Sequence, residues 1–178
     1  MHRTRLWLLA INLVGGIAVL GSYASGLASH PGSAGAVWGG VPEGLRPLYT
    51  VSMLLAAAGY FAFSYLVFFR IDPDRDRLAG RFAYGAFPVI YALILVPSAL
   101  WMPLTFAMLE SPSLPLWIAI RVTLAVVGLA SLGLLAAILS VKPRPAPVAH
   151  AVAIVGAAAF SFQTAVLDAL VWPAYFPV

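Results

Sequence analysis

The chain contains no cysteine and very few charged residues. Without cysteine it can form no disulfide, no thiolate nucleophile and no cysteine-based metal site. Charged residues make up only 9% of the 178 residues, whereas soluble globular domains average about 25%. Hydrophobic residues make up 62% of the chain, and the mean hydropathy is +0.97. This composition excludes a soluble protein and predicts an integral membrane protein with a single domain over residues 1–178.

Several patterns that carry chemistry are also missing. The sequence has no glycine-rich phosphate loop and no pair of histidines at the spacing of a helical metal site. His2 and His150 fall at one expected membrane surface and His30 at the other, so the three cannot share a metal ion. The only lysine, Lys142, falls in a loop, which excludes a retinal Schiff base inside the membrane. We therefore expect no metal site. Because membrane topology explains the +4 net charge, we also expect no nucleic-acid partner.

Five long apolar runs, separated by short polar segments, dominate what is present. A membrane-spanning helix needs about 20 apolar residues, and each run is long enough. The first run is longer than the apolar core of a cleaved signal peptide, so we expect it to remain as a span. The sequence predicts an all-α bundle of five transmembrane helices at about residues 6–28, 46–69, 82–109, 116–141 and 148–172.

The basic residues predict the orientation of this bundle. One end holds eight of them, Arg3, Arg5, Arg70, Arg75, Arg77, Arg81, Lys142 and Arg144, and the other holds Arg46 and Arg121. Because basic residues accumulate on the cytoplasmic side, we expect a cytoplasmic N terminus and an external C terminus, in a bacterial inner membrane. The glycine- and proline-rich segment 30–45, with Trp38 in its middle, then lies outside, and loops of this length are often binding loops.

The third expected span carries a polar and aromatic stripe. Tyr91, Ser98, Trp101 and Thr105 follow one another at steps of seven, three and four, which places them on one helical face. Two prolines flank the tryptophan, and a helix in lipid tolerates proline where neighbours satisfy the freed carbonyl groups. Trp101 also lies too deep for the aromatic belt at the membrane surface. The stripe favours a face toward a cavity; the alternative is a helix–helix seam with an incidental kink.

Two charged residues fall inside the expected spans, Arg121 and Asp168, at similar depth below the external surface. A charge in a span usually faces the bundle interior or water. One interpretation is a ligand site flanked by both side chains; the other is a structural ion pair, or two side chains that reach the headgroups. Asp168 also belongs to a polar stripe with Ser161, Thr164 and Trp172, which is explained either by a shared cavity or by polar contacts between helices.

Three segments match a known pattern. Residues 98–106 are similar to Asn-x-x-Trp-Ser-x-x-Phe-Phe, residues 46–50 to Pro-x-Trp-Thr, and residues 161–172 to Ser-Phe-Ala-Thr-x-Leu-Asn-x-x-Ile-Trp with one residue extra. With five spans and a tryptophan in a long first loop, the chain resembles the TspO/MBR family, the tryptophan-rich sensory proteins related to the animal translocator protein. It departs from that pattern in three places, where Ser98 replaces Asn, Tyr49 replaces Trp and Asp168 replaces Asn. The family's Trp-x-Pro-Pro motif in the first loop is also missing.

The resemblance implies a receptor or transport-like protein that forms a homodimer and binds a hydrophobic ligand. Tetrapyrroles such as protoporphyrin, and sterols in animals, are the ligands of this family, in a pocket among the helices under the first loop. Aromatic rings would stack on the macrocycle, and Arg121 would pair with a propionate. Apart from such a tetrapyrrole or a lipid as ligand, no cofactor is expected. The expected ligand-binding residues are Trp38, Tyr49, Met53, Ser98, Trp101, Arg121, Thr164 and Asp168.

Two other functions remain open. In the first, the chain is a structural or accessory subunit of a larger membrane complex, and its polar stripes are seams between proteins. In the second, it is a membrane enzyme of the sterol-isomerase type. That reaction needs acid and base groups facing a cavity, yet only Asp168 lies at membrane depth, with Glu110 at the edge. We therefore expect no enzymatic activity.

Overall fold

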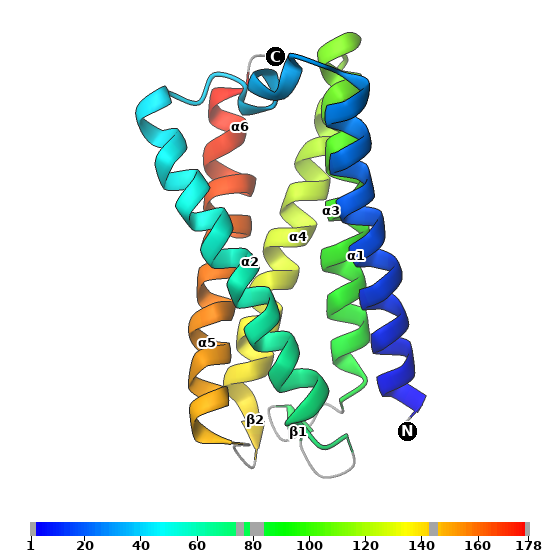
Figure 1. The fold of residues 1–178 in the computed structure, drawn as a ribbon, viewed down its shortest axis with the longest axis vertical. Coiled ribbons are helices and arrows are strands. Elements are labelled where there is room, and N and C mark those ends of the chain that lie inside the picture. Colours follow the sequence, from blue (N-terminus) through cyan, green and yellow to red (C-terminus); the bar gives the residue numbers. More distant parts are fainter. Residues whose placement is uncertain (1–2, 74–76, 79–83, 143–145, 177–178) are drawn as a thin grey trace.

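The structure is a computed structural model that describes residues 3–73, 77–78, 84–142 and 146–176. Among these residues, five helices are long and apolar enough to cross a membrane, which confirms the predicted number (Figure 1). The first four are α1 (Arg3–Ser29), α2 (Arg46–Phe69), α3 (Ala86–Glu110) and α4 (Leu114–Ser140). The fifth consists of α5 (Pro147–Ser161), a π-helix η3 (Phe162–Val171) and α6 (Trp172–Tyr175). The two ends of the chain lie at opposite ends of the bundle.

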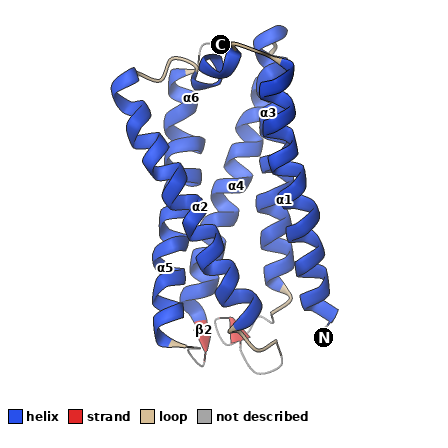
Figure 2. Cartoon of the chain, viewed as in Figure 1, coloured by secondary structure: helices blue, strands red, loops and turns tan. Residues whose placement is uncertain are grey.

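The two loops at the N-terminal end of the bundle pair with each other. Strand β1 (Arg77–Leu78) lies antiparallel to β2 (Val141–Lys142), with Arg77 opposite Lys142 (Figure 2). This small sheet departs from the predicted all-α fold. Strands of two residues are too short to produce the alternating pattern by which a strand is read from sequence. Their pairing confirms that the two basic loops lie at the same end of the bundle.

The helices pack as a chain of neighbours. α1 packs against α3, α3 against α4, α4 against the fifth helix, and α2 against α5. α2 and α5 cross at close range, because a Cβ atom at Gly59 would lie only 2.3 Å from the carbonyl oxygen of Gly156. Small residues permit such close contact between membrane helices. α1 is the least covered helix, with Leu8 as its one buried residue.

The N-terminal half of the bundle is closed by aromatic contacts. Tyr60 of α2 lies against Phe63, Phe160 and the fully buried Tyr91 of α3. Its hydroxyl also donates a 2.6 Å hydrogen bond to Asn12 of α1. Tyr91, which the sequence placed on one stripe with Trp101, therefore belongs to this cluster and not to the aromatic cluster in the other half of the bundle. Side chains of α2 thus contact both α1 and α3.

Segment 30–45 covers the other end of the bundle. It contains two short 3₁₀-helices, η1 (Ser33–Trp38) and η2 (Glu43–Leu45), where the composition predicted an irregular loop. The amide of Gly40 donates to the carbonyl oxygen of Tyr175 at 2.8 Å. The indole of Trp172 donates to the carbonyl oxygen of Val37 at 2.9 Å. These bonds hold the segment against the end of the fifth helix. We call the half of the bundle that segment 30–45 covers the loop-side half.

Candidate functional site

Aromatic side chains from every part of the chain gather in the loop-side half. Ring contacts with centroids 4.6 to 6.3 Å apart join five of them in succession, and Trp38 and Tyr49 form a separate pair 5.9 Å apart. They lie around a buried apolar core that includes Tyr49, Leu167 and Trp172. We call this set the loop-side cluster; its members are Tyr23, Trp38, Tyr49, Trp101, Trp117, Trp172 and Phe176.

Trp101 has a hydrogen-bond donor without a partner. Its ring centroid lies 5.8 Å from those of both Tyr23 and Trp172, and its indole Nε1 is buried and makes no hydrogen bond. The hydroxyl groups of Ser98 and Thr105 on the same stripe donate to backbone carbonyl oxygens of α3 itself, at 2.7 and 2.8 Å, and neither accepts from the indole. Buried polar groups are nearly always paired, so an unpaired donor in this position needs an explanation.

The π-helix places a carboxylate next to an amide in the same half. Gln163 donates a 2.8 Å hydrogen bond to Asp168, five residues later. In an α-helix, side chains five residues apart point about 140° away from each other, so they cannot meet. The i→i+5 bonding of η3 turns them to the same side, and the amide of Trp172 shows this bonding by donating to Leu167. Such π-turns often occur at functional sites.

The surroundings of Asp168 are polar on several sides. Asp168 directly follows Leu167, whose carbonyl oxygen accepts from the Tyr49 hydroxyl, so the carboxylate adjoins the loop-side cluster. The side-chain oxygens of Gln163 and Ser161 are buried without a partner. These oxygens and the indole Nε1 of Trp101 are therefore buried polar atoms that lack a hydrogen bond.

Three expected site residues have identified partners. The hydroxyl of Tyr49 donates to the carbonyl oxygen of Leu167 at 3.0 Å, and Trp38 packs edge-on against the Tyr49 ring at 5.9 Å. The Thr164 hydroxyl lies 2.8 Å from Ser131 of α4, so it joins two helices. Tyr49 and Trp38 thus belong to the loop-side cluster, whereas Thr164 belongs to a helix–helix seam.

Two expected site residues lie away from the others. Arg121 is exposed, with its guanidinium 5.7 Å from the centre of the Trp117 ring. No ion pair joins it to Asp168, although both residues lie within the described chain. An unpaired charge costs less at the surface than inside a bundle. Met53 is 42% exposed, while Tyr49 on the same helix is buried. An apolar side chain can face lipid without cost, so its hydrophobicity did not reveal its direction.

Tyr23 and Gln163 are site residues that the sequence reasoning did not select. Tyr23 is the one aromatic residue in the second half of α1, among small residues, and that contrast is a usable signal. Gln163 stands beside the polar stripe of the fifth span in an α-helical projection. Only the π-helix makes it a neighbour of Asp168.

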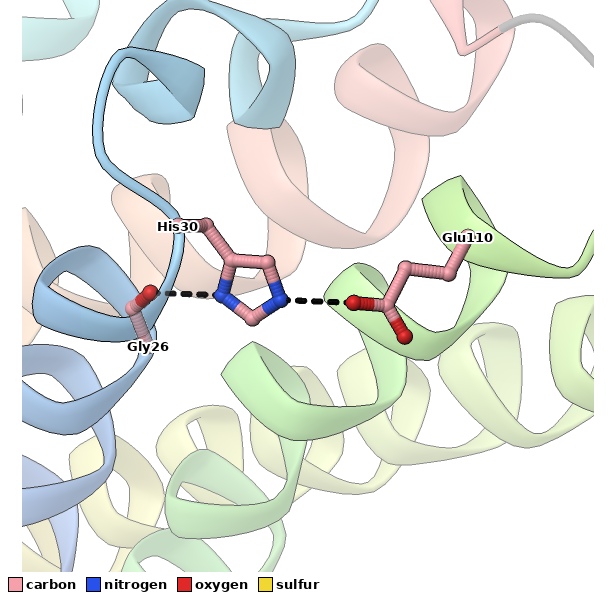
Figure 3. Close-up of polar contacts among 3 residues, drawn as sticks. All are labelled: Gly26, His30 and Glu110. Atoms are coloured by element: carbon pink, nitrogen blue, oxygen red, sulfur yellow. Dashed lines mark hydrogen bonds and ion pairs between the residues drawn. The ribbon is translucent and has the colours of Figure 1, made fainter.

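A second polar group lies where α1 ends. His30 places Nδ1 2.8 Å from the carbonyl oxygen of Gly26 and Nε2 2.8 Å from Glu110 Oε1 (Figure 3). The ring also stacks on Phe106, with centroids 4.0 Å apart. Both nitrogens face acceptors, which favours the doubly protonated ring. The Gly26 carbonyl, followed by the Glu110 carboxylate, accordingly raises the pKa of His30 above its ordinary value. No group of three potential metal ligands occurs among the described residues.

Comparison of the chain with models of protein families, with curated proteins and with solved structures found no match. The resemblance to the TspO/MBR family therefore stays a prediction from three segments. Function has to be argued from the loop-side half itself, and from the groups in it that lack partners.

Proposed function

We propose that the chain is a multi-pass membrane protein that binds a hydrophobic small molecule in the loop-side half of its bundle. The observation that carries this proposal is the buried, unpaired indole N–H of Trp101. A buried donor that loses its hydrogen bond costs about 1–3 kcal/mol. A ligand that accepts a hydrogen bond from this donor would offset that cost. A purely structural role for Trp101 would leave the donor without a partner.

The chemistry around Trp101 supports a mainly apolar ligand. Binding sites for small molecules are lined mostly by apolar and aromatic side chains, with a few polar groups that orient the ligand. The loop-side cluster supplies the rings, while Trp101, Gln163 and Asp168 supply one donor and several acceptors. Segment 30–45 covers this end of the bundle through its bonds to the fifth helix.

A flat tetrapyrrole is the ligand we propose first. Its macrocycle would stack on the aromatic rings of the cluster, and the resemblance to the TspO/MBR family implies the same ligand. The distribution of basic residues supports an orientation with the N terminus in the cytoplasm of a bacterial cell and segment 30–45 outside. The ligand would then enter or leave on the external side.

A titration with protoporphyrin tests this function. We would follow porphyrin absorbance in the wild-type protein and in Trp101→Phe and Asp168→Asn variants. Trp7→Phe is the matched control, because Trp7 is 60% exposed near the opposite end of α1. We expect saturable binding that weakens about fivefold in Trp101→Phe, the equivalent of one hydrogen bond of about 1 kcal/mol. Non-saturating changes that are equal in all four proteins would show partitioning into detergent and would remove the proposal.

A structural role in a larger complex is the second candidate. The weak cover of α1, which buries only Leu8, favours it. Membrane helices associate by close packing, so a partner helix on α1 would account for this exposure. The mass of the purified protein in lipid nanodiscs separates the two functions. A homodimer without other subunits supports the receptor, whereas stoichiometric co-purification of another membrane protein supports the subunit. We propose no catalysis, because Asp168, and Glu110 at the end of α3, are the acids available in the described third to fifth spans.

A further inference from the structure

A groove opens between α2 and α5 on the side away from the loop-side half. The two helices cross at Gly59 and Gly156, where a Cβ atom on either residue would meet backbone of the other helix within 3 Å. Toward the end that holds β1 and β2 the helices separate, as Figure 1 shows. The close crossing therefore forms the apex of a V, and the residues that line the groove lie on its two arms, after Gly59 in α2 and before Gly156 in α5.

The walls of the groove are apolar. Phe61, Ala62 and Tyr65 line it from α2, and Val148 and Val152 line it from α5. Its volume is about 660 Å³, within the usual range of about 300–1,000 Å³ for ligand sites. Four of these five side chains are exposed in the folded chain. A molecule from the surrounding lipid could therefore enter the groove from the side, without any rearrangement of the helices.

The mouth of the groove carries a positive charge. Arg70 lines the site, directly after the last residue of α2, and its guanidinium lies 5.8 Å from the centre of the Tyr65 ring. Arg70 makes no ion pair with any other residue of the described ranges. Asp72, the nearest acid in sequence, has an interaction of its own. A cation held at the edge of an apolar groove is complementary to a molecule with an apolar tail and an anionic head.

We propose that this groove binds one anionic phospholipid, with an acyl chain between α2 and α5 and the phosphate at Arg70. Guanidinium groups bind phosphate oxygens in a two-pronged geometry. Basic pockets between transmembrane helices are known sites for anionic headgroups. A peptide would suit the walls poorly, because its backbone groups would lack hydrogen-bond partners at membrane depth. The site is independent of the loop-side half, so it can exist whether or not a tetrapyrrole binds there.

Native mass spectrometry tests the proposal. We would strip the protein of lipid and offer it micelles with equal amounts of phosphatidylglycerol and phosphatidylcholine. The wild-type protein should retain one phosphatidylglycerol in preference to phosphatidylcholine. In Arg70→Gln the preference for phosphatidylglycerol over phosphatidylcholine should fall at least fivefold. Arg3→Ala is the matched control, because Arg3 is also exposed at this end of the bundle but lies on α1, which packs against α3; it should keep the preference.

A second variant tests the groove itself. Ala62→Trp fills the space between the arms of the V and should reduce retention of phosphatidylglycerol while leaving the charge at Arg70 unchanged. Circular dichroism and thermal unfolding would establish that each variant is folded. Equal retention of both lipids, or an equal effect of Arg70→Gln and Arg3→Ala, would contradict the proposal. If the wild type were a dimer and Ala62→Trp a monomer with unaltered lipid retention, this result would also contradict the proposal. The groove would then be assigned to a second copy of the chain.

Discussion

Asp168 has a single described hydrogen-bond partner, the amide of Gln163. A charged group inside a span is expensive unless it has a role in pairing or in function. Arg121, the cation at comparable depth in the sequence, is exposed at the surface of the bundle and does not supply the pairing. Among the described residues no cation pairs with Asp168, so its hydrogen bond with Gln163 is the contact that accounts for its place in the loop-side half.

Substitutions at Asp168 separate the hydrogen bond from the charge. Asp168→Asn keeps an acceptor for Gln163, so we expect less than about 1 kcal/mol of change in stability. Asp168→Leu leaves the buried Gln163 amide without its partner and should destabilise the protein by about 1–3 kcal/mol. Thermal unfolding in detergent compares the two variants with the wild type. If Asp168→Leu were as stable as Asp168→Asn, the hydrogen bond between Gln163 and Asp168 would not contribute to the stability of the protein.

The pH dependence of stability should report on His30. Its pKa in the folded protein is raised above 6.5, first by the Gly26 carbonyl and then by the Glu110 carboxylate. A group whose pKa is higher in the folded protein than in the unfolded chain stabilises the folded state. This contribution is complete when the pH is below the pKa of the unfolded chain, and it is lost as the pH rises through the pKa of the folded protein. The wild type should therefore lose stability above about pH 6.5 relative to His30→Gln, which does not titrate.

Proton NMR of the His30 ring gives its pKa directly, and Glu110→Gln should lower that pKa. A pKa at or below the ordinary value in the wild-type protein would show that the contacts with Gly26 and Glu110 do not hold a charged ring.

Among the elements, η3 depends on side chains from other helices. The hydroxyl of Tyr49 donates to the carbonyl oxygen of Leu167, within the π-helical stretch. Tyr49→Phe removes this donor at nearly constant volume and should destabilise the protein by about 0.5–1.5 kcal/mol. Tyr65→Phe is the matched control, because Tyr65 is 48% exposed on the same helix. Urea or thermal midpoints that move equally for both variants would argue against a specific role for the Leu167 contact.

The crossing of α2 and α5 gives a second prediction for an element. Gly59→Ala places a methyl group against the backbone of Gly156, where only movement of a helix could relieve the contact. Overpacking of this kind costs about 1–3 kcal/mol. Gly16→Ala on α1 meets nothing within 4 Å and should be neutral or slightly stabilising, because alanine favours helix more than glycine does. A Gly59→Ala protein as stable as Gly16→Ala would show that the two helices are not in close contact.

At the scale of the whole molecule, length and hydropathy were sufficient to predict five helices. Hydropathy depends on composition, and composition does not change with packing. The direction of a side chain does depend on packing. Met53 and Arg121 were expected among the ligand-binding residues, but each is exposed. Their directions are set by how α2 crosses α5 and how α4 packs on its neighbours, and one sequence does not contain that information.

The π-helix could not be read from the sequence for a related reason. An α-helical projection separates Gln163 from Asp168, and periodicity analysis assumes one fixed period throughout a helix. The extra residue in segment 161–172, relative to the pattern it resembles, is the sequence feature that coincides with the π-helix. The unpaired Trp101 donor was likewise invisible, because its lack of a partner depends on which acceptors the packed helices bring to the indole.

The central claim is that a bound molecule accepts a hydrogen bond from Trp101. The protein has five tryptophans, so its ¹⁵N-labelled form should show five indole N–H signals, which Trp→Phe variants assign. On addition of protoporphyrin, the Trp101 signal should move saturably while that of the exposed Trp7 stays in place. If instead the Trp101 signal stayed unchanged, or moved no more than that of Trp7, no ligand would occupy the loop-side half. The chain would then have to be explained as a subunit of a larger complex.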